Sequence, residues 1–426
     1  MQNKKDALST KVGMLMRDNS MIFIFLGLAL LTTITSGQSL TVSLNDFIIR
    51  FFRNFLLVVA LILPINAGIG LNFGIVLGAL GSQVALVMVL AMGAYQTNVG
   101  SMLLWTLLTI VICIICGYLL GLLFNATKGQ EMISGLFVGF LATGVYMFIL
   151  MVVLGGIIKI GDSALVSQYG APIKVTINLP ATMYQGFDNM ISLPFTYLIV
   201  LSYIVALAYC TVKIIQSIRT KEKGHAMVVG AGTIALTVVF LFVMLYQPAY
   251  TMFARFKLPV VTFLLSVLVA VITWWLGQTK LGHDFLSIKN DMGIAASVGI
   301  CVDRTRMIAI ILSTVFAGLG QLVYIQNMGT LRTYGMQNTV ATFAIAAILI
   351  GGATIKKANM KNAVFGTILF HIIYSTAPNA AKNVFGNIQI GEYFRVFMCY
   401  GVIAVAIVMF AVQEAQNARR KLKLVE

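Results

Sequence analysis

The residues whose types and spacing best suit a specific task lie in one polar segment of an otherwise apolar chain. Between Leu281 and Gln321, charged and small residues come together just before an apolar helix. Six charged side chains, which we expect to lie in water, occur in it: Asp284, Lys289, Asp291, Asp303, Arg304 and Arg306. Ala295, Ala296 and Gly299 leave a narrow helix face on which another protein can pack closely. This pattern favours the transmission of force from a protein partner, and a plain solvated loop is the alternative.

Elsewhere in the sequence, no group of residues is arranged for catalysis. Cys113 and Cys116 have C-x-x-C spacing, but they lie within an apolar run, where two small apolar side chains are the simpler interpretation. The sequence has no G-x-x-x-x-G-K-[ST] phosphate loop, no cluster of His and carboxylates that predicts a metal, and no nucleophile grouped with a base. We therefore expect a non-enzymatic protein without a cofactor or a bound metal.

Composition predicts the fold class. Of 426 residues, 59% are hydrophobic and 10% are charged, whereas soluble domains carry about 25% charged residues. The mean hydropathy is +0.95. Repeated apolar runs approach the ~20 residues with which a helix crosses a bilayer, while a membrane barrel would show short alternating segments. The sequence therefore predicts an all-α polytopic transmembrane bundle, in which Met21–Thr35 is a retained first span.

Apolar runs mark the candidate spans, of which we expect ten to twelve to cross the membrane. There are twelve: 20–36, 54–68, 73–95, 102–124, 133–158, 195–214, 227–247, 259–277, 307–325, 339–352, 363–377 and 396–413. Several runs are short, and Pro64, Gly68 and Gly70 interrupt the second.

Positive charges decide the expected orientation, because short cytoplasmic loops are enriched in Lys and Arg. With the N-terminus inside, 20 of the 29 basic residues fall on the cytoplasmic side. The predicted parts are a cytoplasmic tail 1–19, a transmembrane domain 20–413 and a basic cytoplasmic tail 414–426. Within the domain, segment 279–306 is cytoplasmic, and the long loop 159–193 faces outward as a lid or a docking site. Topology and attraction to anionic lipids thus explain the net charge of +16 without nucleic acid.

The acidic residues argue against transport driven by an ion gradient. All 13 fall in loops, tails or the ends of spans, whereas carriers driven by protons or sodium usually hold carboxylates at membrane depth. Because backbone carbonyls also bind sodium, a secondary carrier stays a second hypothesis, and a non-transporting scaffold is a third. His371 is the one imidazole deep in a predicted span, where a packing residue is a simpler interpretation than a proton relay.

Two places interrupt the helical pattern and are candidates for a solute path. In Leu63–Gly74, a proline and several glycines free backbone groups that membrane proteins place only against protein or a polar cavity. The second place surrounds Ala346–Gly352. The candidate path residues are Asn66, Gly70, Asn72, Gly74, Gly351 and Gly352. Close packing between helices is the alternative in both places.

These segments also carry a resemblance to a known family. Residues 282–304 and 313–320 resemble the cytoplasmic coupling region of permeases of binding-protein-dependent ABC importers. Within these permeases, they are similar to the branch that serves ribose-type sugars, nucleosides and branched-chain amino acids. Residues 346–367 resemble the second signature of that branch, and residues 70–74 resemble its early broken helix. The diagnostic sequence covers roughly a third of the chain.

The resemblance implies a mechanism and partners. An extracytoplasmic binding protein would deliver a sugar or nucleoside, or a branched-chain amino acid, to a path between two identical or related permease subunits. A pair of cytoplasmic ATPases would move the spans through the coupling segment, in a bacterial inner membrane. The implied coupling residues are Gly282, Phe285, Asp291, Gly293, Ala295, Ala296, Gly299 and Arg304.

The sequence departs from the family pattern in three places. His283 stands where a basic residue is common, and residues 353–357 replace a Gly-rich link. Asn72 lies near the position at which many sugar permeases carry an acidic residue. The third departure leaves nucleosides and branched-chain amino acids open as solutes.

Overall fold

The structure, a computed structural model, describes residues 20–154, 165–166, 173–219 and 223–422. It divides into two compact units, one of Met1–Gly186 with Leu264–Glu426 and one of Phe187–Phe263. The predicted tail 1–19 and much of the predicted outward loop lie outside the described residues.

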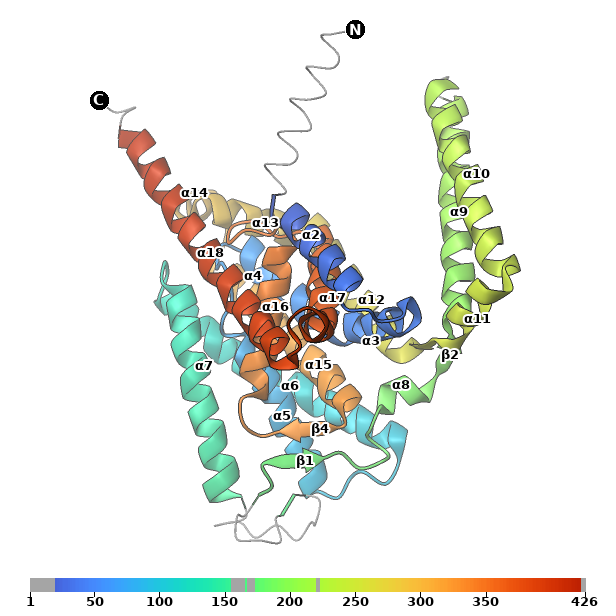
Figure 1. Ribbon diagram of the computed structural model, residues 1–426. Coiled ribbons are helices and arrows are strands. Elements are labelled where there is room, and N and C mark those ends of the chain that lie inside the picture. Colours follow the sequence, from blue (N-terminus) through green and yellow to red (C-terminus); the bar gives the residue numbers. More distant parts are fainter. Residues whose placement is uncertain (1–19, 155–164, 167–172, 220–222, 423–426) are drawn as a thin grey trace. The chain divides into compact units, whose positions relative to one another are not determined.

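Helices form most of the first unit (Figure 1). In chain order they are α2 (Ser20–Thr35), α3 (Leu40–Val59), α4 (Ile62–Asn66), α5 (Ile75–Ala91), α6 (Asn98–Ala126), α7 (Glu131–Phe148) with the π-helical turn Ile149–Val153, α13 (Lys280–Asn290), α14 (Met292–Ser297), α15 (Val302–Met328), α16 (Met336–Ile350), α17 (Met360–Phe385) and α18 (Ile388–Leu422). Two short strands, β1 (Thr176–Asn178) and β4 (Thr330–Arg332), complete it.

The second unit consists mainly of two long helices, α9 (Phe195–Arg219) and α10 (Lys223–Leu245). They pack through Tyr203, whose ring stacks on Phe240 with 3.9 Å between centroids and whose hydroxyl donates to Thr237 Oγ1 over 3.1 Å. The unit also holds α11 (Gln247–Arg255) and the antiparallel strands β2 (Ser192–Pro194) and β3 (Lys257–Pro259). Two helices begin in one unit and end in the other: α8 (Gly186–Met190) and α12 (Val260–Gln278).

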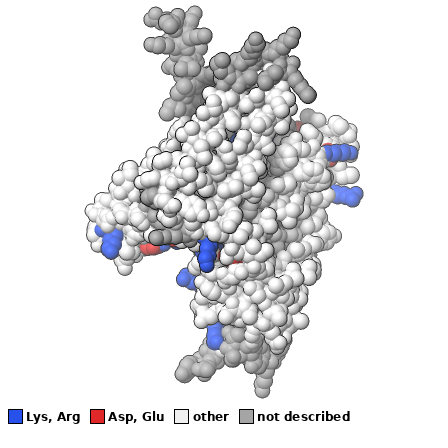
Figure 2. Space-filling model, turned by 90° about the vertical axis from the view of Figure 1, so that its right-hand side faces the viewer, with Lys and Arg blue, Asp and Glu red and all other residues white. Residues whose placement is uncertain are grey.

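The prediction of a polytopic helical bundle is confirmed. Among the described residues, seven helical segments are long and apolar enough to cross a membrane: Val42–Asn66, Asn98–Ala126, Glu131–Val153, Phe195–Ser217, Val260–Gln278, Val302–Met328 and Ile388–Val405. With four shorter apolar helices, Met21–Thr35, Ile75–Ala91, Val229–Leu245 and Met336–Ile350, the apolar helices of the described residues number eleven, within the predicted range. Large apolar side chains such as Trp274 and Phe397 lie exposed. Figure 2 shows one face of the molecule on which uncharged residues cover most of the surface, as a lipid-facing protein requires.

The core of the first unit forms where α15 packs against α3, α5 and α6. Small residues permit the close approach, because a Cβ added at Gly320 would lie 2.6 Å from Leu57 Cγ. Cys113 on α6 is fully buried in this core, and its Sγ donates to the carbonyl oxygen of Gly78 over 3.4 Å. This contact supports the interpretation of Cys113 as a small packing residue.

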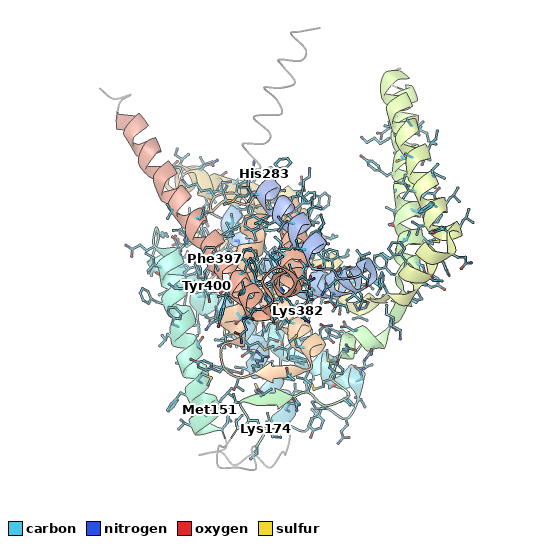
Figure 3. The ribbon with its side chains drawn as sticks, viewed as in Figure 1. Met151, Lys174, His283, Lys382, Phe397 and Tyr400 are labelled. Atoms are coloured by element: carbon cyan, nitrogen blue, oxygen red, sulfur yellow. The ribbon has the colours of Figure 1, made fainter. Side chains whose placement is uncertain are left out.

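The two ends of α15 define the two ends of the first unit. A helix of 27 residues is on the order of 40 Å long. At its first residue the chain arrives from α13 and α14, and just after its last residue β4 pairs antiparallel with β1. Figure 1 shows α13 and α14 at one end and β1 and β4 at the other, and Figure 3 shows His283 and Lys174 at the same two ends. Residues 173–186 of the predicted outward loop, which belong to the first unit, therefore lie at the end opposite the predicted coupling segment.

Candidate functional site

The candidate site is the surface that α14 and its flanking residues expose, which we call the coupling surface and define as residues 291–304. It is held in place by α13, whose Gly282, Phe285 and Ile288 follow helical spacing and are all buried. These three residues attach α13 to the unit. The polar remainder of the helix faces outward, as the amphipathic pattern requires.

Asp291 fixes the start of α14. Its carboxylate oxygen Oδ1 accepts hydrogen bonds from the backbone N–H groups of Gly293 and Ile294 over 2.7 and 3.0 Å. These are amide groups that a helix leaves without partners in its first turn. The carboxylate of Asp291 thus caps the N-terminus of α14, a helix of only six residues.

We expect Asp291→Ala to loosen α14 by about 1 kcal/mol, the usual effect of losing an N-cap. Amide hydrogen exchange at Gly293 and Ile294 should accelerate, while exchange in α15 stays unchanged. Asp291→Asn keeps an oxygen acceptor and serves as the matched control. Equal exchange in the alanine variant and the wild type would show that the cap does not hold the helix.

The predicted coupling residues divide into a buried and an exposed set. Gly282, Phe285 and Ala295 are buried, and they attach the segment to the unit. The exposed set, which a partner can reach, is Asp291, Gly293, Ala296, Gly299 and Arg304. Gly299 has φ +91°, a backbone conformation that glycine adopts readily, and no atom lies within 4 Å of an added Cβ.

Two apolar residues of the coupling surface were missed by the sequence analysis. Ile294 and Val298 are 65% and 76% exposed, between the charged residues Asp291 and Asp303 in the sequence. Beside them, a hollow of about 630 Å³ is lined by Lys128, Met292, Gly293, Ala296, Ile300, Cys301, Val302, Asp303 and Arg304. Exposed apolar side chains rimmed by polar ones are typical of a protein interface. The sequence gives little indication that Ile294 and Val298 are exposed, because a six-residue helix is too short to show which of its faces is buried.

A buried ion pair connects the coupling surface to the spans. The guanidinium of Arg306, in the second turn of α15, pairs with the carboxylate of Glu131 at the start of α7, and both side chains are almost completely buried. Arg306 also lies 3.6 Å from Met292 Sδ and 3.5 Å from the carbonyl oxygen of Phe124. The prediction that Arg306 lies in water is therefore wrong. Its charge is satisfied by a carboxylate 175 positions away, which sequence spacing does not reveal.

A second, exposed ion pair lies beside the first. Lys128 Nζ is 2.5 Å from Asp303 Oδ1, and the backbone oxygen of Asp303 accepts from Asn125 Nδ2 over 2.9 Å. Together the two pairs join the ends of α6, α7 and α15 directly beneath α14. The segment around α14 is therefore in contact with three spans.

The broken helix after α4 packs against α13. Gly68 has φ +77°, and a Cβ added there would lie 3.0 Å from the Cα of Lys289. Asn66 contacts the loop between α16 and α17, since its Nδ2 donates to the carbonyl oxygen of Ala358 and its Oδ1 accepts from the Ala358 N–H. Asn72 is fully buried and donates to Ser313 Oγ over 3.3 Å.

The second predicted break lies between α16 and α17. Asn362 Nδ2 donates to the carbonyl oxygen of Gly351 over 2.7 Å. A Cβ at Gly351 would overlap the backbone oxygen of Asn362, and one at Gly352 would lie 3.2 Å from Ile22. Because Asn66 also contacts this loop, the two predicted breaks lie together near α13. Of the six predicted path residues, Gly70, Asn72, Gly74 and Gly351 are buried in this subunit.

We expect Gly351→Ala to destabilise the subunit by about 1–3 kcal/mol, because the methyl group would force α16 and α17 apart. Thermal unfolding of the purified subunit measures the change. Gly144→Ala is the matched control, since no atom lies within 4 Å of a Cβ added at that helical glycine. A Gly351→Ala variant as stable as Gly144→Ala would contradict the close contact.

Basic residues also gather at this end. Partial burial, followed by the positive charge of Lys357, lowers the pKa of Lys289 below that of a free lysine. Lys289 and Lys357 come from segments almost 70 positions apart. Their proximity agrees with the positive charge that the sequence assigned to the cytoplasmic side.

Comparison with known proteins identifies the family. A family model described as the permease component of branched-chain amino acid transport systems matches residues 43–408. The chain belongs to this permease family. The coupling surface and both helix breaks fall inside the matched range.

The curated relatives align with only part of this permease. An autoinducer 2 import system permease protein LsrC from Klebsiella pneumoniae is 29% identical over 82 residues, which cover 19% of this chain and 24% of the relative. The LsrC protein from Enterobacter sp. is 28% identical over 88 residues, which cover 21% and 25%. The alignments thus span about a quarter of the length of these relatives. No solved structure matches the chain.

Proposed function

We propose that this permease forms the translocation path of an ABC importer for a small polar solute, a sugar or a nucleoside. An extracytoplasmic binding protein delivers the solute, and separate ATPase subunits supply the energy. The observation that carries the proposal is the coupling surface, on which small residues and the exposed Ile294 and Val298 lie between charged residues. The Arg306–Glu131 ion pair beside it joins α15 to α7, and Arg306 also contacts α6.

The same observation supports the orientation that the proposal needs. The coupling surface faces the cytoplasm, where the ATPases lie, and the β1–β4 end receives the binding protein. Two permease subunits, identical or related, enclose the path in a bacterial inner membrane. Closure of the ATPases on ATP then shifts the population between inward-open and outward-open states.

A branched-chain amino acid is the alternative solute. The description of the matching family favours it, and Asn72 in place of an acidic side chain removes one feature of sugar permeases. An ion-driven secondary carrier is the alternative mechanism, and it would transport without an ATPase.

Affinity purification of the chain from its native membrane in mild detergent tests the proposal. Mass spectrometry should find an ATPase with a phosphate-binding loop and a second permease subunit in the purified complex. Recovery of the well-folded chain alone, repeatedly, would contradict the proposal. Uptake by vesicles that contain only this chain under an ion gradient would establish the secondary carrier instead.

A further inference from the structure

A polar stripe runs along one face of α3, although the helix belongs to a predicted span. Asp46, Arg50, Arg53 and Asn54 recur at the spacing of helical turns, so they share one face. In the span Val42–Asn66, 83% of the most apolar window is buried inside the protein. Within the stripe, Arg53 and Asn54 are buried and Asp46 and Arg50 are half-buried, so its C-terminal part is covered by neighbouring helices.

Arg53 is a buried cation without a carboxylate partner. Its side chain is 9% exposed. Its Nη1 donates to Asn327 Oδ1 over 3.3 Å and lies 3.1 Å from Met328 Sδ, and its guanidinium lies 4.9 Å from the centre of the Tyr324 ring. In the described part of the chain, no carboxylate forms an ion pair with it, and its Nε is buried without a hydrogen-bond partner.

Two further arginines approach the same place. The guanidinium groups of Arg50 and Arg395 lie 5.7 and 4.1 Å from the centre of the Tyr374 ring. Arg395 is paired with Glu392 on its own helix, so its charge is already balanced. Asp46 lies one turn from Arg50, but none of the ion pairs in the described residues joins it to an arginine. Positive charge therefore exceeds negative charge in this cluster.

The physical consequence is a demand for negative charge. A buried cation without a directly paired counter-charge is costly, and a protein retains one only where something compensates for it. Arginine is suited to a bound oxyanion, since its planar fork of N–H groups matches a carboxylate or a phosphate. The half-buried side chains of Arg50, Tyr324 and Tyr374 leave one side of the cluster open.

The cluster is remote from the coupling surface. Tyr324 and Asn327 belong to the last turns of α15, whereas Arg306 belongs to its second turn. The intervening turns separate the two places by on the order of 30 Å. A ligand at the cluster would therefore bind at the end that the proposed topology turns outward.

We propose that Arg50 and Arg53, flanked by Tyr324 and Tyr374, bind an oxyanion, the carboxylate or phosphate group of a small solute or of a lipid headgroup. Where the oxyanion belongs to a transported solute, the inference deepens the proposed function and rests on it. Binding itself requires no transport, so it is measured on the purified full chain.

The experiment follows thermal unfolding of the chain in an uncharged detergent. Sodium phosphate and sodium acetate are the soluble probes, with sodium chloride at equal ionic strength as the reference. Dioctanoyl phosphatidylglycerol is the lipid probe, with dioctanoyl phosphatidylcholine as its reference. Stabilisation by phosphate or acetate identifies a soluble anion, and stabilisation by phosphatidylglycerol alone identifies a lipid headgroup.

The variants show whether Arg53 is responsible. Arg53→Met should bind the effective probe about 10- to 100-fold more weakly, as expected when charge-assisted hydrogen bonds are lost. Arg332→Met is the matched control, because it removes the same charge from an exposed side chain of β4. Arg50→Met replaces Arg53→Met if the latter does not fold.

The inference is overturned if no probe stabilises the wild type beyond its reference, or if the arginine variants respond as Arg332→Met does. Failure of ATPase association in the purification experiment would leave this result unchanged. The two proposals can therefore fail separately.

Discussion

Ala296→Trp should abolish solute uptake while the subunit still inserts and folds. Ala296 is exposed beside the hollow at α14, and a partner that packs there approaches the helix closely because the side chain is a single methyl group. An indole would hold the partner several ångströms away and remove the contact between α14 and its binding groove. Uptake into cells and the amount of subunit in the membrane fraction are the two measurements.

Gly299→Trp should have the same effect, with a control that separates size from backbone strain. Because Gly299 has φ +91°, any side chain there adds strain. Asn tolerates this conformation better than most residues, so Gly299→Asn should retain most of the uptake. Normal uptake by both tryptophan variants would exclude the coupling role of α14.

The second large effect is expected from the buried ion pair. Arg306→Met leaves the carboxylate of Glu131 buried without a partner, and such a loss destabilises a protein by about 3–5 kcal/mol. The midpoint temperature of thermal unfolding of the Arg306→Met subunit should fall, and less folded subunit should be recovered on purification. Because Arg306 also contacts Met292 of α14, coupling between ATP hydrolysis and transport should weaken in any protein that remains folded.

The double variant Arg306→Met with Glu131→Leu tests the physical cause. Removing both charges avoids the unpaired carboxylate, so much of the stability should return. Lys128→Ala is the matched control for an exposed pair, and it should change stability by about 1 kcal/mol or less. A double variant no more stable than Arg306→Met would show that packing, and not the ion pair, holds these helices together.

Much of the fold follows from the sequence because hydropathy is a local property. Over their described residues, eleven of the twelve apolar runs fall within or largely within a helix, and the run 54–68 is divided between α3 and α4. The spacing of Gly282, Phe285 and Ile288 also reflects the buried face of α13, since one turn of a helix determines it.

The pairings within the site do not follow from the sequence, because they depend on tertiary contacts. Asn66 meets Ala358 across 292 positions, and Arg306 meets Glu131 across 175. A charged residue near the end of a span is equally compatible with water and with a buried partner. The sequence therefore predicted that residues 63–74 break the helix, but not that the break packs against Lys289 of α13.

The arginine stripe of α3 was missed for a related reason. The apolar run that begins at residue 54 was taken as the span, so Arg50 and Arg53 lay outside it. The structure extends the candidate span back to Val42. The phenylalanines of α3 supply apolar surface, and Arg53 and Asn54 of the polar stripe are buried inside the protein.

Photo-crosslinking from position 296 in native membranes tests the central claim most directly. A photoreactive amino acid in place of Ala296 should give a covalent product with a cytoplasmic ATPase, identified by mass spectrometry. The same group in place of Arg332, at the opposite end of α15, should give none with the ATPase. Crosslinks from position 296 to lipid alone, or equal ATPase crosslinks from both positions, would contradict the assignment of α14 as the coupling helix.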